Sequence, residues 1–525
     1  MLPLYTTGQI RQVDSEAINY FSFPSLLLME NAAINSVNIA IDKLGLNSKF
    51  DKIAVICGRG NNGGDGYAIA RHFAVRGYKV EVFSLYSDAE LTPDALVNFR
   101  LLSRIKEAMP ENIYVGTINS NYYKPALLSA TVIIDAILGS GAKGKLSQEI
   151  AETVNFLNEL PAKKIAIDIP TGIDGDTGFF FSEEAFFADL TISLGELKVG
   201  LYTPKALEVC GEIVRGDIGV HHSMYGEIKA NKFIIEPEDA YFSLPERERT
   251  AHKYSHGRVL AVAGSRFFPG AALLAAHSAL KIGAGAVKIA APASLKNMIF
   301  PTNESELVFE FYDDENKGFL AAKALKQLES EFTSGKIILI GPGLGREAQT
   351  QKSIVKILKE TPELPGVIDA DALNAISGGV YKKLNLENKI LTPHSGEFAV
   401  LTGLKTEDIE KNIYKAGVDF VEETGAYLVL KSSRTMIFTP EGQTYINPLG
   451  NSGMAKIGTG DVLTGVIAGL LAQSNDLESA AISGVFLHSL SADLLKETET
   501  EYGYTATQIK DNLPGAIKFL QKSFA

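Results

Sequence analysis

Three short stretches in the first half of the chain place Asn or Asp directly after an apolar run. The first, GRGNNGGDG, contains Asn61, Asn62 and Asp65, while Asp135 lies in VIIDAILGSG and Asp168 lies in IAIDIPTGIDGDTG. Carboxylate and amide oxygens at such positions can exchange protons with a substrate or hold a hard cation. For a single aspartate, capping of the following loop is the simpler interpretation. Three polar strand ends in series favour a functional site.

The first of these stretches is also rich in glycine. Glycine lets the backbone turn tightly and approach a ligand closely, and amide groups at the start of a helix bind anions. The spacing contains neither the Gly-Lys-Ser/Thr of a Walker A loop nor the usual dinucleotide fingerprint. A glycine-rich turn alone can serve geometry only, but the polar residues within this one predict a ligand.

The second half of the chain carries its own anion-binding pattern, GTGD at residues 458–461, in front of a run of small and apolar residues. Three amides at a helix start can stabilise charge on a phosphoryl group, and Asp461 beside them can take a proton from a hydroxyl. An aspartate that merely caps the helix would explain Asp461 but not the glycine-rich loop before it. The pattern is therefore typical of phosphoryl transfer.

Other polar loops of the second half fit a nucleotide site. LKSSRT ends an apolar run with Lys431, GPGLG (341–345) lets backbone approach a ligand, and TPHSGE places His394 and Glu397 in one turn. A lone histidine is more often a structural hydrogen-bonding group, but the proline and glycine around His394 favour ligand contact. Glu397 could help to hold magnesium, through water.

Strand-like apolar runs alternate with helix-like segments over most of the chain, and this alternation predicts parallel sheets covered by helices on both faces. Ligands of such sheets bind at the carboxyl ends of the strands, where the polar residues above are expected to converge. The expected strands cover residues 52–57, 79–85, 131–137, 164–169, 190–195, 258–264, 286–292, 336–343, 366–373, 389–394 and 426–431, and the expected helices cover residues 66–77, 146–160 and 269–285.

The alternation breaks near residues 218–235, which are polar and have no long period. A chain of 525 residues is long enough for two large domains at about 100–200 residues each. We therefore expect two α/β domains, at residues 1–222 and 223–525.

Composition narrows the class of protein. The net charge is −12 and no basic run is visible, which argues against nucleic acid as a partner and favours small-molecule substrates. Cys57 and Cys210 form no metal-binding motif or disulfide framework, and both end apolar runs, so we expect buried thiols. The chain shows no secretion signal and no apolar run of about 18 residues, so we expect a cytoplasmic protein without membrane contact. We further expect a homo-oligomer.

The motifs GRGNNGGDGYAIAR, DAILGSG and DIPTGIDGDTG resemble the YjeF N-terminal family, the NAD(P)H-hydrate epimerases, over roughly residues 5–220. The resemblance implies a Rossmann-like three-layer αβα fold and interconversion of the R and S epimers at C6 of the hydrated nicotinamide ring. Either the ring hydroxyl leaves and returns, or the ring opens and closes. Both routes need a proton donor and acceptor beside C6.

The same resemblance implies site residues. A potassium ion would be held by Asn62, Asp135 and Thr171, and Asp168 would be the catalytic acid/base. Lys198 is a weaker candidate for a supporting role, and a surface lysine is its simpler interpretation. The implied substrate-binding residues are Asn61, Asn62, Gly63, Gly64, Asp65, Gly139, Ser140, Gly141, Ala142, Lys143, Gly144, Lys145 and Asp168.

Residues 235–522 resemble the YjeF C-terminal family, the ADP/ATP-dependent NAD(P)H-hydrate dehydratases of ribokinase-like αβα fold. The motifs that carry this resemblance are VLAVAGSRFFPGAALLAAHSALKIGAGAV, GPGLG, DADALN, LTPHSGE, NSGMAKIGTGDVLTG and YTATQIKDNLPGAI. It implies magnesium-dependent dehydration of the S epimer to NAD(P)H at the expense of ADP, with AMP and phosphate as products, or of ATP. Asp461 would be the base that lets the C6 hydroxyl attack the terminal phosphate.

The implied contacts divide between the two ligands. Those with the hydrated nucleotide are Ala272, Gly343, His394 and Asp461, and those with the adenine nucleotide are Lys431, Ser432, Ser433, Arg434, Thr435 and Gly460. The chain departs from the family pattern at Ser432, where relatives usually have glycine, and at Ser395, where they often have proline.

Two alternatives remain open at the level of the sequence. A ribokinase-like small-molecule kinase, such as a vitamin-precursor kinase, would use the same glycine-rich loop and Asp461, but its product would keep the phosphate. The N-terminal domain could instead be a ligand-binding or protein-interaction module. Asp168 and the three predicted potassium ligands count against a purely structural role.

Overall fold

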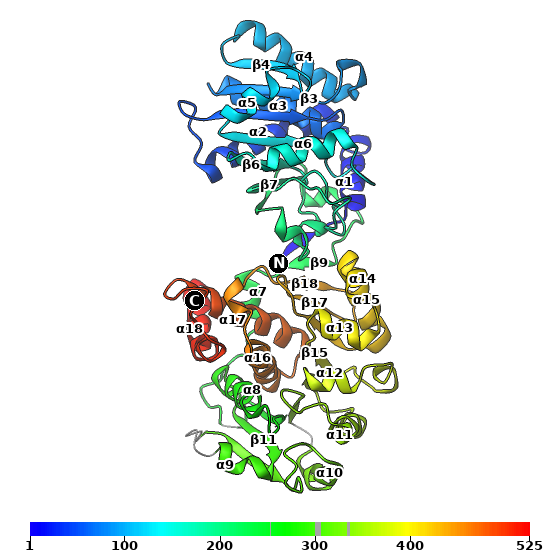
Figure 1. The fold of residues 1–525 in the computed structure, drawn as a ribbon, viewed down its shortest axis with the longest axis vertical. Coiled ribbons are helices and arrows are strands. Elements are labelled where there is room, and N and C mark those ends of the chain that lie inside the picture. Colours follow the sequence, from blue (N-terminus) through cyan, green and yellow to red (C-terminus); the bar gives the residue numbers. More distant parts are fainter. Residues whose placement is uncertain (253, 300–305, 333–335, 525) are drawn as a thin grey trace. The chain divides into compact units, whose positions relative to one another are not determined.

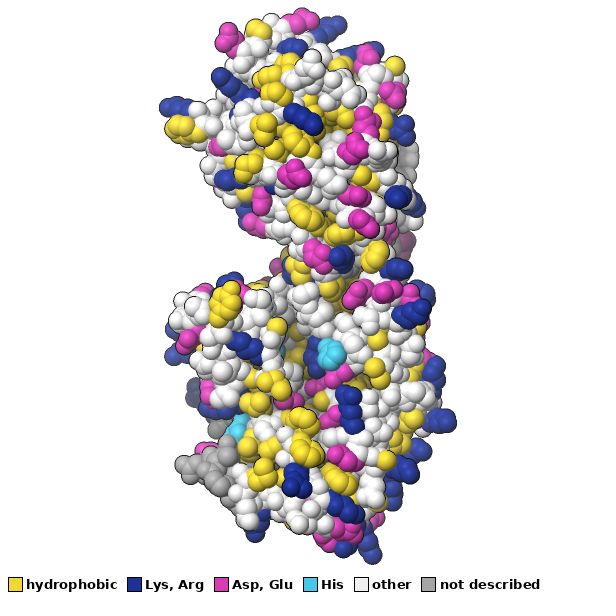
Figure 2. Space-filling model, in the orientation of Figure 1, with side chains coloured by type: hydrophobic (Ala, Val, Ile, Leu, Met, Phe, Trp, Pro, Cys, Tyr) yellow, Lys and Arg dark blue, Asp and Glu magenta, His cyan; other side chains and the backbone are white. Residues whose placement is uncertain are grey.

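The computed structural model describes the chain except for residues 253, 300–305, 333–335 and 525. Two compact units are present (Figure 1): residues 3–230 form the first, and residues 231–525 together with Met1 and Leu2 form the second. Lys, Arg, Asp and Glu side chains are interspersed over the face that Figure 2 shows of each unit. Within the described residues, no helix combines the length and the apolar character needed to span a membrane.

The first unit contains a seven-stranded sheet in the order β4-β3-β2-β5-β6-β7-β8, and all neighbouring strands are parallel. If the strands are renumbered so that β2 is strand 1 and β8 is strand 7, their order in the sheet is 3-2-1-4-5-6-7. This is an extended version of the Rossmann order. The strands are β2 (Lys52–Cys57), β3 (Lys79–Ser84), β4 (Ile113–Thr117), β5 (Val132–Ala136), β6 (Lys163–Ile167), β7 (Leu190–Leu194) and β8 (Glu212–Gly216).

Helices cover both faces of this sheet. They are α1 (Thr7–Asn19), α2 (Ser25–Leu44), α3 (Asn61–Val75), α4 (Pro93–Ala108), α5 (Tyr123–Ser129) and α6 (Gln148–Asn158). Along β2, Val55 packs in one cluster with α2, α3 and α4, whereas Ile56 packs in another with α5 and α6. Successive strand residues point to opposite faces, so a strand buried on both sides reads as a continuous apolar run. The Rossmann-like αβα expectation is confirmed.

The second unit contains the strands of an eleven-stranded sheet in the order β1-β9-β18-β17-β16-β15-β14-β13-β10-β11-β12, although only Leu2 of β1 belongs to this unit. Its strands from β10 to β16 are parallel and repeat the order 3-2-1-4-5-6-7 when counted from β10. The strands are β1 (Leu2–Leu4), β9 (Lys232–Ile234), β10 (Arg258–Val262), β11 (Ala286–Pro292), β12 (Val308–Tyr312), β13 (Ile337–Ile340), β14 (Gly366–Ile368), β15 (Lys389–Leu391), β16 (Tyr427–Leu430), β17 (Met436–Phe438) and β18 (Thr444–Ile446).

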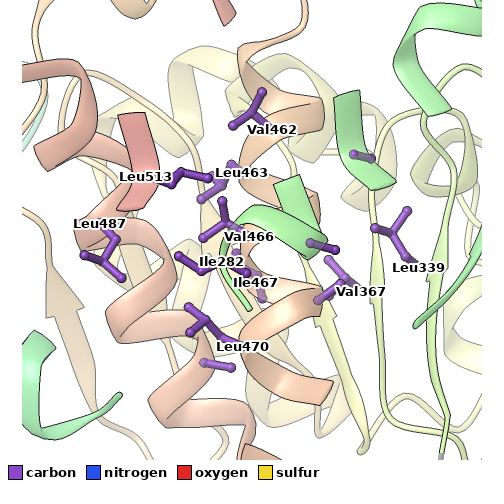
Figure 3. Close-up of a cluster of buried hydrophobic side chains, with 14 of the residues drawn as sticks. Ile282, Leu339, Val367, Val462, Leu463, Val466, Ile467, Leu470, Leu487 and Leu513 are labelled. Atoms are coloured by element: carbon purple, nitrogen blue, oxygen red, sulfur yellow. The ribbon is translucent and has the colours of Figure 1, made fainter. Parts of the chain in front are cut away.

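The core of the second unit is built around one helix, α16. The helices are α7 (Pro237–Phe242), α8 (Pro269–Lys281), α9 (Lys296–Ile299), α10 (Ala322–Leu328), α11 (Ala348–Glu360), α12 (Asp371–Ala375), α13 (Ser395–Thr402), α14 (Thr406–Lys411), α15 (Ile413–Thr424), α16 (Thr459–Ser474), α17 (Leu477–Lys496) and α18 (Ala506–Phe524). Figure 3 shows apolar side chains of α16 among those of the sheet and of neighbouring helices. Gly465 lets α8 approach closely, because a Cβ there would lie 2.0 Å from the Ala275 carbonyl oxygen. This close contact with α8 therefore fixes the position of α16, the helix at whose start the GTGD sequence lies.

The structure corrects one expected element in the first unit. The helix expected at residues 66–77 begins at Asn61, so most of the glycine-rich stretch is helical rather than a turn. The reason is close packing, because a Cβ on Gly63 would lie 2.0 Å from the Gly58 carbonyl oxygen. The strands expected at residues 52–57 and 286–292 have the expected bounds, and the two cysteines are free and buried, as expected.

Candidate active sites

The first candidate site lies at the carboxyl ends of β2, β5 and β6, next to the point where the strand order reverses. Asn62 is in the first turn of α3, and Asp168 follows β6. A Cβ placed on Gly139 would lie 2.9 Å from Asp168 Oδ2 and 3.2 Å from Asn62 Cγ. The structure thus brings together three of the residues that the sequence suggested, from three different segments.

Asn62 is the unusual residue of this site. Its side chain is only 9% exposed, and neither Oδ1 nor Nδ2 has a hydrogen-bond partner among the described residues. Buried amide groups are almost always hydrogen-bonded. Gly60, which caps α3, supplies no side-chain cap either, so the first amides of the helix stay free for a ligand. The arrangement is suited to a bound ion or substrate.

Asp135 and Thr171 form a buried pair beside it. Asp135 Oδ1 accepts a hydrogen bond from Thr171 Oγ1 at 2.8 Å, and Asp135 Oδ2 accepts one from the Thr171 amide at 2.8 Å. Burial raises the pKa of Asp135 to about 6, although these hydrogen bonds lower it. Thr171 Oγ1 also accepts from the Leu138 amide at 3.1 Å. This pair thereby fixes the segment that leads to Gly139.

Asp168 has a strained backbone, and its carboxylate is held by a charged and a polar partner. Its φ is +69°, a conformation that only a small share of non-glycine residues adopt. Oδ1 lies 2.6 Å from Lys198 Nζ, and Oδ2 accepts from the Ser140 amide at 2.8 Å. Burial raises the pKa of Asp168, but the Lys198 ammonium and the hydrogen bonds outweigh it and hold the pKa below its usual value.

Lys198 corrects an expectation from the sequence. It is 1% exposed rather than a surface lysine, and besides Asp168 it donates to the Leu194 carbonyl. Two carboxyl groups share its surroundings. Burial raises the pKa of Asp65 well above its usual value, with Asp168 and Asp14 contributing, and burial raises the pKa of Asp14 to about 6. Sequence reasoning missed Asp14, because α1 precedes every recognisable motif.

The remaining predicted residues of the first unit differ in their exposure. Asn61 is exposed and accepts a hydrogen bond from Thr92 at 3.4 Å, whereas Gly64 packs against Met29. In the loop that begins at Gly139, Gly139 and Ser140 approach Asp168. The exposed members of the loop are Gly141, Lys143, Gly144 and Lys145, and Ala142 is half-buried.

The second candidate site surrounds the start of α16. Gly458, with a φ of +89°, precedes the helix and provides no side-chain cap. A helix start without a cap leaves amides available to an anion, and its dipole favours negative charge there. A Cβ on Gly460 would lie only 3.3 Å from Lys431 Nζ. The structure therefore places a lysine ammonium directly at the amides of the GTGD sequence.

Lys431 is positioned by an aspartate that the sequence had not singled out. Lys431 Nζ lies 2.9 Å from Asp369 Oδ1. The other oxygen of Asp369 accepts from Thr464 Oγ1 at 2.6 Å, and Thr464 also donates to the Gly460 carbonyl at 3.0 Å. Ala370, the next residue, has a φ of +51°. One chain of contacts thus joins the end of β14, the end of β16 and the first turn of α16.

Asp461 has the properties of a base that works near neutral pH. Burial, followed by the nearby Asp369, raises the pKa of Asp461 to about 7, while Lys431 lowers it. A general base is most effective when its pKa lies near the working pH. His488 of α17 lies beneath this region, where burial lowers its pKa to about 4 and keeps the imidazole neutral. Nothing in the sequence distinguished His488 from other helix residues.

His394 has a structural role that the sequence did not reveal. Its Nδ1 accepts from the amides of Gly396 at 3.0 Å and Glu397 at 3.3 Å, so it caps α13. Glu397 Oε2 in turn accepts from the His394 amide at 2.9 Å and lies 3.9 Å from Lys431 Nζ. The histidine is therefore fixed beside Lys431, with its ring edge exposed.

Two further loops meet at the reversal of strand order between β10 and β13. A Cβ on Gly343 would lie 2.7 Å from the Phe268 carbonyl oxygen and 2.9 Å from the Ala271 Cβ. A Cβ on Gly264 would lie 3.0 Å from that of Ala272. The predicted contacts Ala272, in the first turn of α8, and Gly343, in the loop after β13, thus lie near the same strand ends, where ligands of doubly wound sheets bind.

The segment from Lys431 to Thr435 forms the turn between β16 and β17. Ser432 Oγ donates to the Arg434 carbonyl at 2.6 Å, and Arg434 donates to the Pro448 carbonyl at 3.0 Å. Ser433 is exposed. Ser432 is not among the described non-glycine residues with positive φ, so serine is accommodated without strain where relatives usually have glycine.

Comparison with known proteins gives matches along the whole chain. Residues 25–200 match the family described as YjeF-related protein N-terminus, and residues 259–515 match the family described as NAD(P)H-hydrate dehydratase. The bifunctional NAD(P)H-hydrate repair enzyme of Moorella thermoacetica is 34% identical over 520 residues, which cover 99% of this chain and 97% of that protein. The enzyme of the same name from Thermofilum pendens is 33% identical and covers 98% of this chain and 96% of its own.

Solved structures resemble the second unit. A ribokinase-like superfamily protein of Enterococcus faecalis is 28% identical, with a TM-score of 0.49, and covers 56% of this chain and 98% of its own. The ADP/ATP-dependent NAD(P)H-hydrate dehydratase of Bacillus subtilis, co-crystallised with ATP and magnesium, is 29% identical, with a TM-score of 0.46. It covers 54% of this chain and 97% of its own.

Proposed function

The chain belongs to the family of bifunctional NAD(P)H-hydrate repair enzymes, and from this premise we propose which of its two sites performs which reaction. The protein is an NAD(P)H-hydrate epimerase and an adenine-nucleotide-dependent NAD(P)H-hydrate dehydratase in one chain. The observation that carries this conclusion is similarity to such an enzyme over 99% of the chain. We assign epimerisation to residues 3–230 and dehydration to residues 231–525.

The first site fits a potassium ion. Asn62 offers a buried amide oxygen without a partner, Thr171 offers a hydroxyl, and Asp135 offers one carboxylate with lone pairs to spare. No group of three or more His, Cys, Asp or Glu that could hold a metal is found among the described residues. Mostly neutral oxygen ligands suit a hard monovalent cation better than a transition metal. When bound, potassium would supply fixed positive charge beside the substrate.

Asp168 is the proposed acid/base of epimerisation. The Lys198 ammonium keeps it ionised at neutral pH, so it is ready to take the proton of the C6 hydroxyl. The free amides at the start of α3 and the loop from Gly139 to Lys145 would bind the phosphates and ribose of the hydrated nucleotide.

The second site is proposed to transfer the terminal phosphoryl group of ADP or ATP. Asp461 takes the proton of the C6 hydroxyl while the hydroxyl oxygen bonds to the terminal phosphorus and the bridging oxygen leaves, giving AMP when ADP is the donor. The amides of Gly460 and Asp461 and the Lys431 ammonium stabilise the charge on the phosphoryl oxygens, while the Thr459 amide donates to the Lys456 carbonyl at 3.4 Å. The phosphorylated oxygen then leaves C6 as phosphate, helped by the lone pair of the ring nitrogen, and loss of a C5 proton restores NAD(P)H.

The contacts of the two nucleotides follow from this assignment. We propose that the hydrated nucleotide lies against Ala272, Gly343 and His394, and that the adenine nucleotide contacts Gly460 and the turn from Lys431 to Thr435. Magnesium would be held mainly by nucleotide phosphates and water, with Glu397 near the ion. Glu397 is not its main ligand in this proposal, because its carboxylate already caps α13. The expected homo-oligomer and cytoplasmic location stay predictions.

Recovery of NADH tests both assignments in one assay. A mixture of both epimers of NADH hydrate is incubated with the protein, magnesium and ADP, with ATP in parallel, and NADH is followed by its absorbance. Recovery of both epimers supports the two activities and identifies the nucleotide used. Recovery of the S epimer alone contradicts the assignment of the first unit. No recovery with either nucleotide contradicts the assignment of the second unit and directs attention to kinase activity on small alcohols.

A further inference from the structure

Helix α1 is fastened to the loops of the first candidate site before it begins. The Tyr5 amide donates to the Leu197 carbonyl at 3.0 Å, and the Val199 amide donates to the Tyr5 carbonyl at 3.0 Å. These two bonds enclose Lys198. The Thr7 amide and hydroxyl then bind the carboxylate of Asp176, at 2.6 and 3.0 Å. The start of α1 is therefore fixed to the segments that carry Lys198 and follow Asp168.

One turn further along the chain, α1 contacts the loop that begins at Gly139. Arg11 donates to the Ser140 carbonyl at 3.2 Å, and the amide of the same Ser140 donates to Asp168 Oδ2 at 2.8 Å. Asp14 follows Arg11 by three residues and so lies on the same side of the helix. The flanking Val13 and Ala17 are buried in the cluster that attaches α1 to the unit. This geometry directs the Asp14 carboxyl toward the surroundings of Asp168 and Lys198.

The charged groups around Asp14 come from three other segments. They are Lys198 after β7, Asp168 after β6 and Asp65 on α3, while Arg11 precedes it on its own helix. Within the described residues, the Asp14 side chain makes no hydrogen bond or ion pair that would give it a structural role, whereas neighbouring Arg11 and Thr7 do. Burial raises the pKa of Asp14 to about 6 against the lowering effect of the Lys198 ammonium and with a further rise from Asp168, while the pKa of Asp168 stays below its usual value. Two carboxyl groups whose environments move their pKa values apart suit one acid and one base.

Resting on the proposed epimerase activity, we propose that Asp14 is the general acid of the first site and works opposite Asp168. A base together with an acid suits ring opening, in which one proton is taken and another is given, whereas departure of the hydroxyl needs an acid alone. Asp168 takes the proton of the C6 hydroxyl, the C6–N1 bond breaks to leave an aldehyde, and N1 receives the proton of Asp14. After rotation, N1 attacks the other face of the aldehyde, its proton returns to Asp14, and the oxygen regains the proton from Asp168.

The test is the pH profile of epimerisation in variants of α1. Conversion of the isolated R epimer of NADH hydrate to the S epimer is followed by chromatography without ADP or ATP, so that the second unit is idle. The rate without protein is subtracted at each pH. Wild type is compared with Asp14→Asn and Asp14→Glu, and with Glu16→Gln, an exposed position on the same helix. General acids contribute roughly 10²- to 10⁴-fold to a rate.

We expect wild-type kcat/KM to fall as pH rises through the pKa of Asp14, because the acid form is needed. Asp14→Asn should lose roughly 10²-fold or more in rate and lose this alkaline limb. Asp14→Glu should restore much of the rate with a shifted limb, and Glu16→Gln should match wild type. The Glu variant decides the matter if the Asn variant does not fold.

Two results would overturn the inference, and a third concerns its premise. An epimerisation rate of Asp14→Asn within a few fold of the wild-type rate contradicts the inference. An alkaline limb of the pH profile that persists unchanged in Asp14→Asn or Asp14→Glu also contradicts it and would assign the acid to Asp65. A wild-type protein that interconverts no epimers contradicts the proposed epimerase function itself.

Discussion

Lys198 Nζ lies 2.6 Å from Asp168 Oδ1 in the first unit, and both side chains are buried. The second unit repeats this relationship, with Lys431 Nζ 2.9 Å from Asp369 Oδ1. In each case the aspartate directly follows a parallel strand and a residue with positive φ lies at that strand end. The pairs differ in use: the aspartate of the first carries the proposed chemistry, whereas the aspartate of the second holds a lysine against the GTGD amides.

Replacing Lys198 with methionine should raise the pKa of Asp168. Without the ammonium, burial dominates, and a buried carboxylate without its partner costs about 3–5 kcal/mol of stability. In the wild-type protein, the lowered pKa of Asp168 contributes stability to the folded state. This contribution is complete above the unfolded pKa and is lost as pH falls through the folded pKa. The variant should lack it. We expect epimerisation to fall and its acidic limb to move to higher pH, measured from R-to-S conversion. Lys79→Met, at an exposed lysine of the same unit, is the control, and an unmoved acidic limb would contradict the role of Lys198.

Asn62→Ala should remove the dependence of epimerisation on potassium and most of its rate. Because the Asn62 side chain has no protein partner among the described residues, its loss should leave the thermal unfolding midpoint nearly unchanged. The measurement is the epimerisation rate across potassium concentrations, with tetramethylammonium keeping the ionic strength constant. Asn61→Ala, at the exposed neighbour, should keep the wild-type response. Identical potassium curves for wild type and Asn62→Ala would exclude this residue as a ligand.

Asp461→Asn should abolish dehydration while epimerisation continues in the same protein. The base must be ionised, so wild-type dehydration should fall as pH drops below about 7, the pKa to which burial raises Asp461. A general base contributes roughly 10²- to 10⁴-fold, which sets the size of the expected loss. NADH formation from the S epimer with ADP or ATP measures the effect, and R-to-S conversion is the internal control. Dehydration within tenfold of wild type would require another base.

The sequence predicted those parts of the two sites that lie within one local pattern. An apolar strand followed by Asp168, or a glycine-rich loop before Asp461, is visible without any tertiary information, since strand, loop and helix start are neighbours in the chain. The same holds for β2 and β11, which are mostly apolar: β2 carries a lysine only at its first residue and β11 only at Lys288. Short strands such as β17 and β18, with three residues each, carry too few positions for a periodic pattern.

The sequence could not predict contacts between distant segments. Lys198 looks like a surface lysine because its partner Asp168 precedes it by a strand and two loops. Asp14 and His488 lie on ordinary amphipathic or apolar helices, and only tertiary packing places them beside a site. The helical start at Asn61 was also hidden, since glycine normally disfavours a helix and is tolerated here because Gly63 packs against backbone.

Lys456→Met should weaken nucleotide binding without touching the proposed phosphate contacts. Lys456 Nζ donates to the carbonyls of Tyr504 at 2.5 Å, Tyr502 at 3.0 Å and Glu501 at 3.4 Å, and so fastens the loop before Gly458 to the segment after α17. Without the Lys456 ammonium, these three carbonyls no longer hold the loop in place. The loop must then lose conformational entropy each time its amides bind an anion, and this loss weakens binding. We expect KM for ADP or ATP to rise roughly tenfold, a change that corresponds to about 1.4 kcal/mol.

The matched control for this variant is Lys496→Met. Lys496 also binds this segment, through Glu501 Oε1 at 2.5 Å, but it is an exposed pair at the surface. Exposed ion pairs contribute little, so this variant should keep the wild-type KM. Steady-state dehydration of the S epimer at varied nucleotide concentration separates the two. Equal KM values in both variants and wild type would show that the GTGD loop is ordered by α16 alone, since Gly465 already fixes that helix against α8.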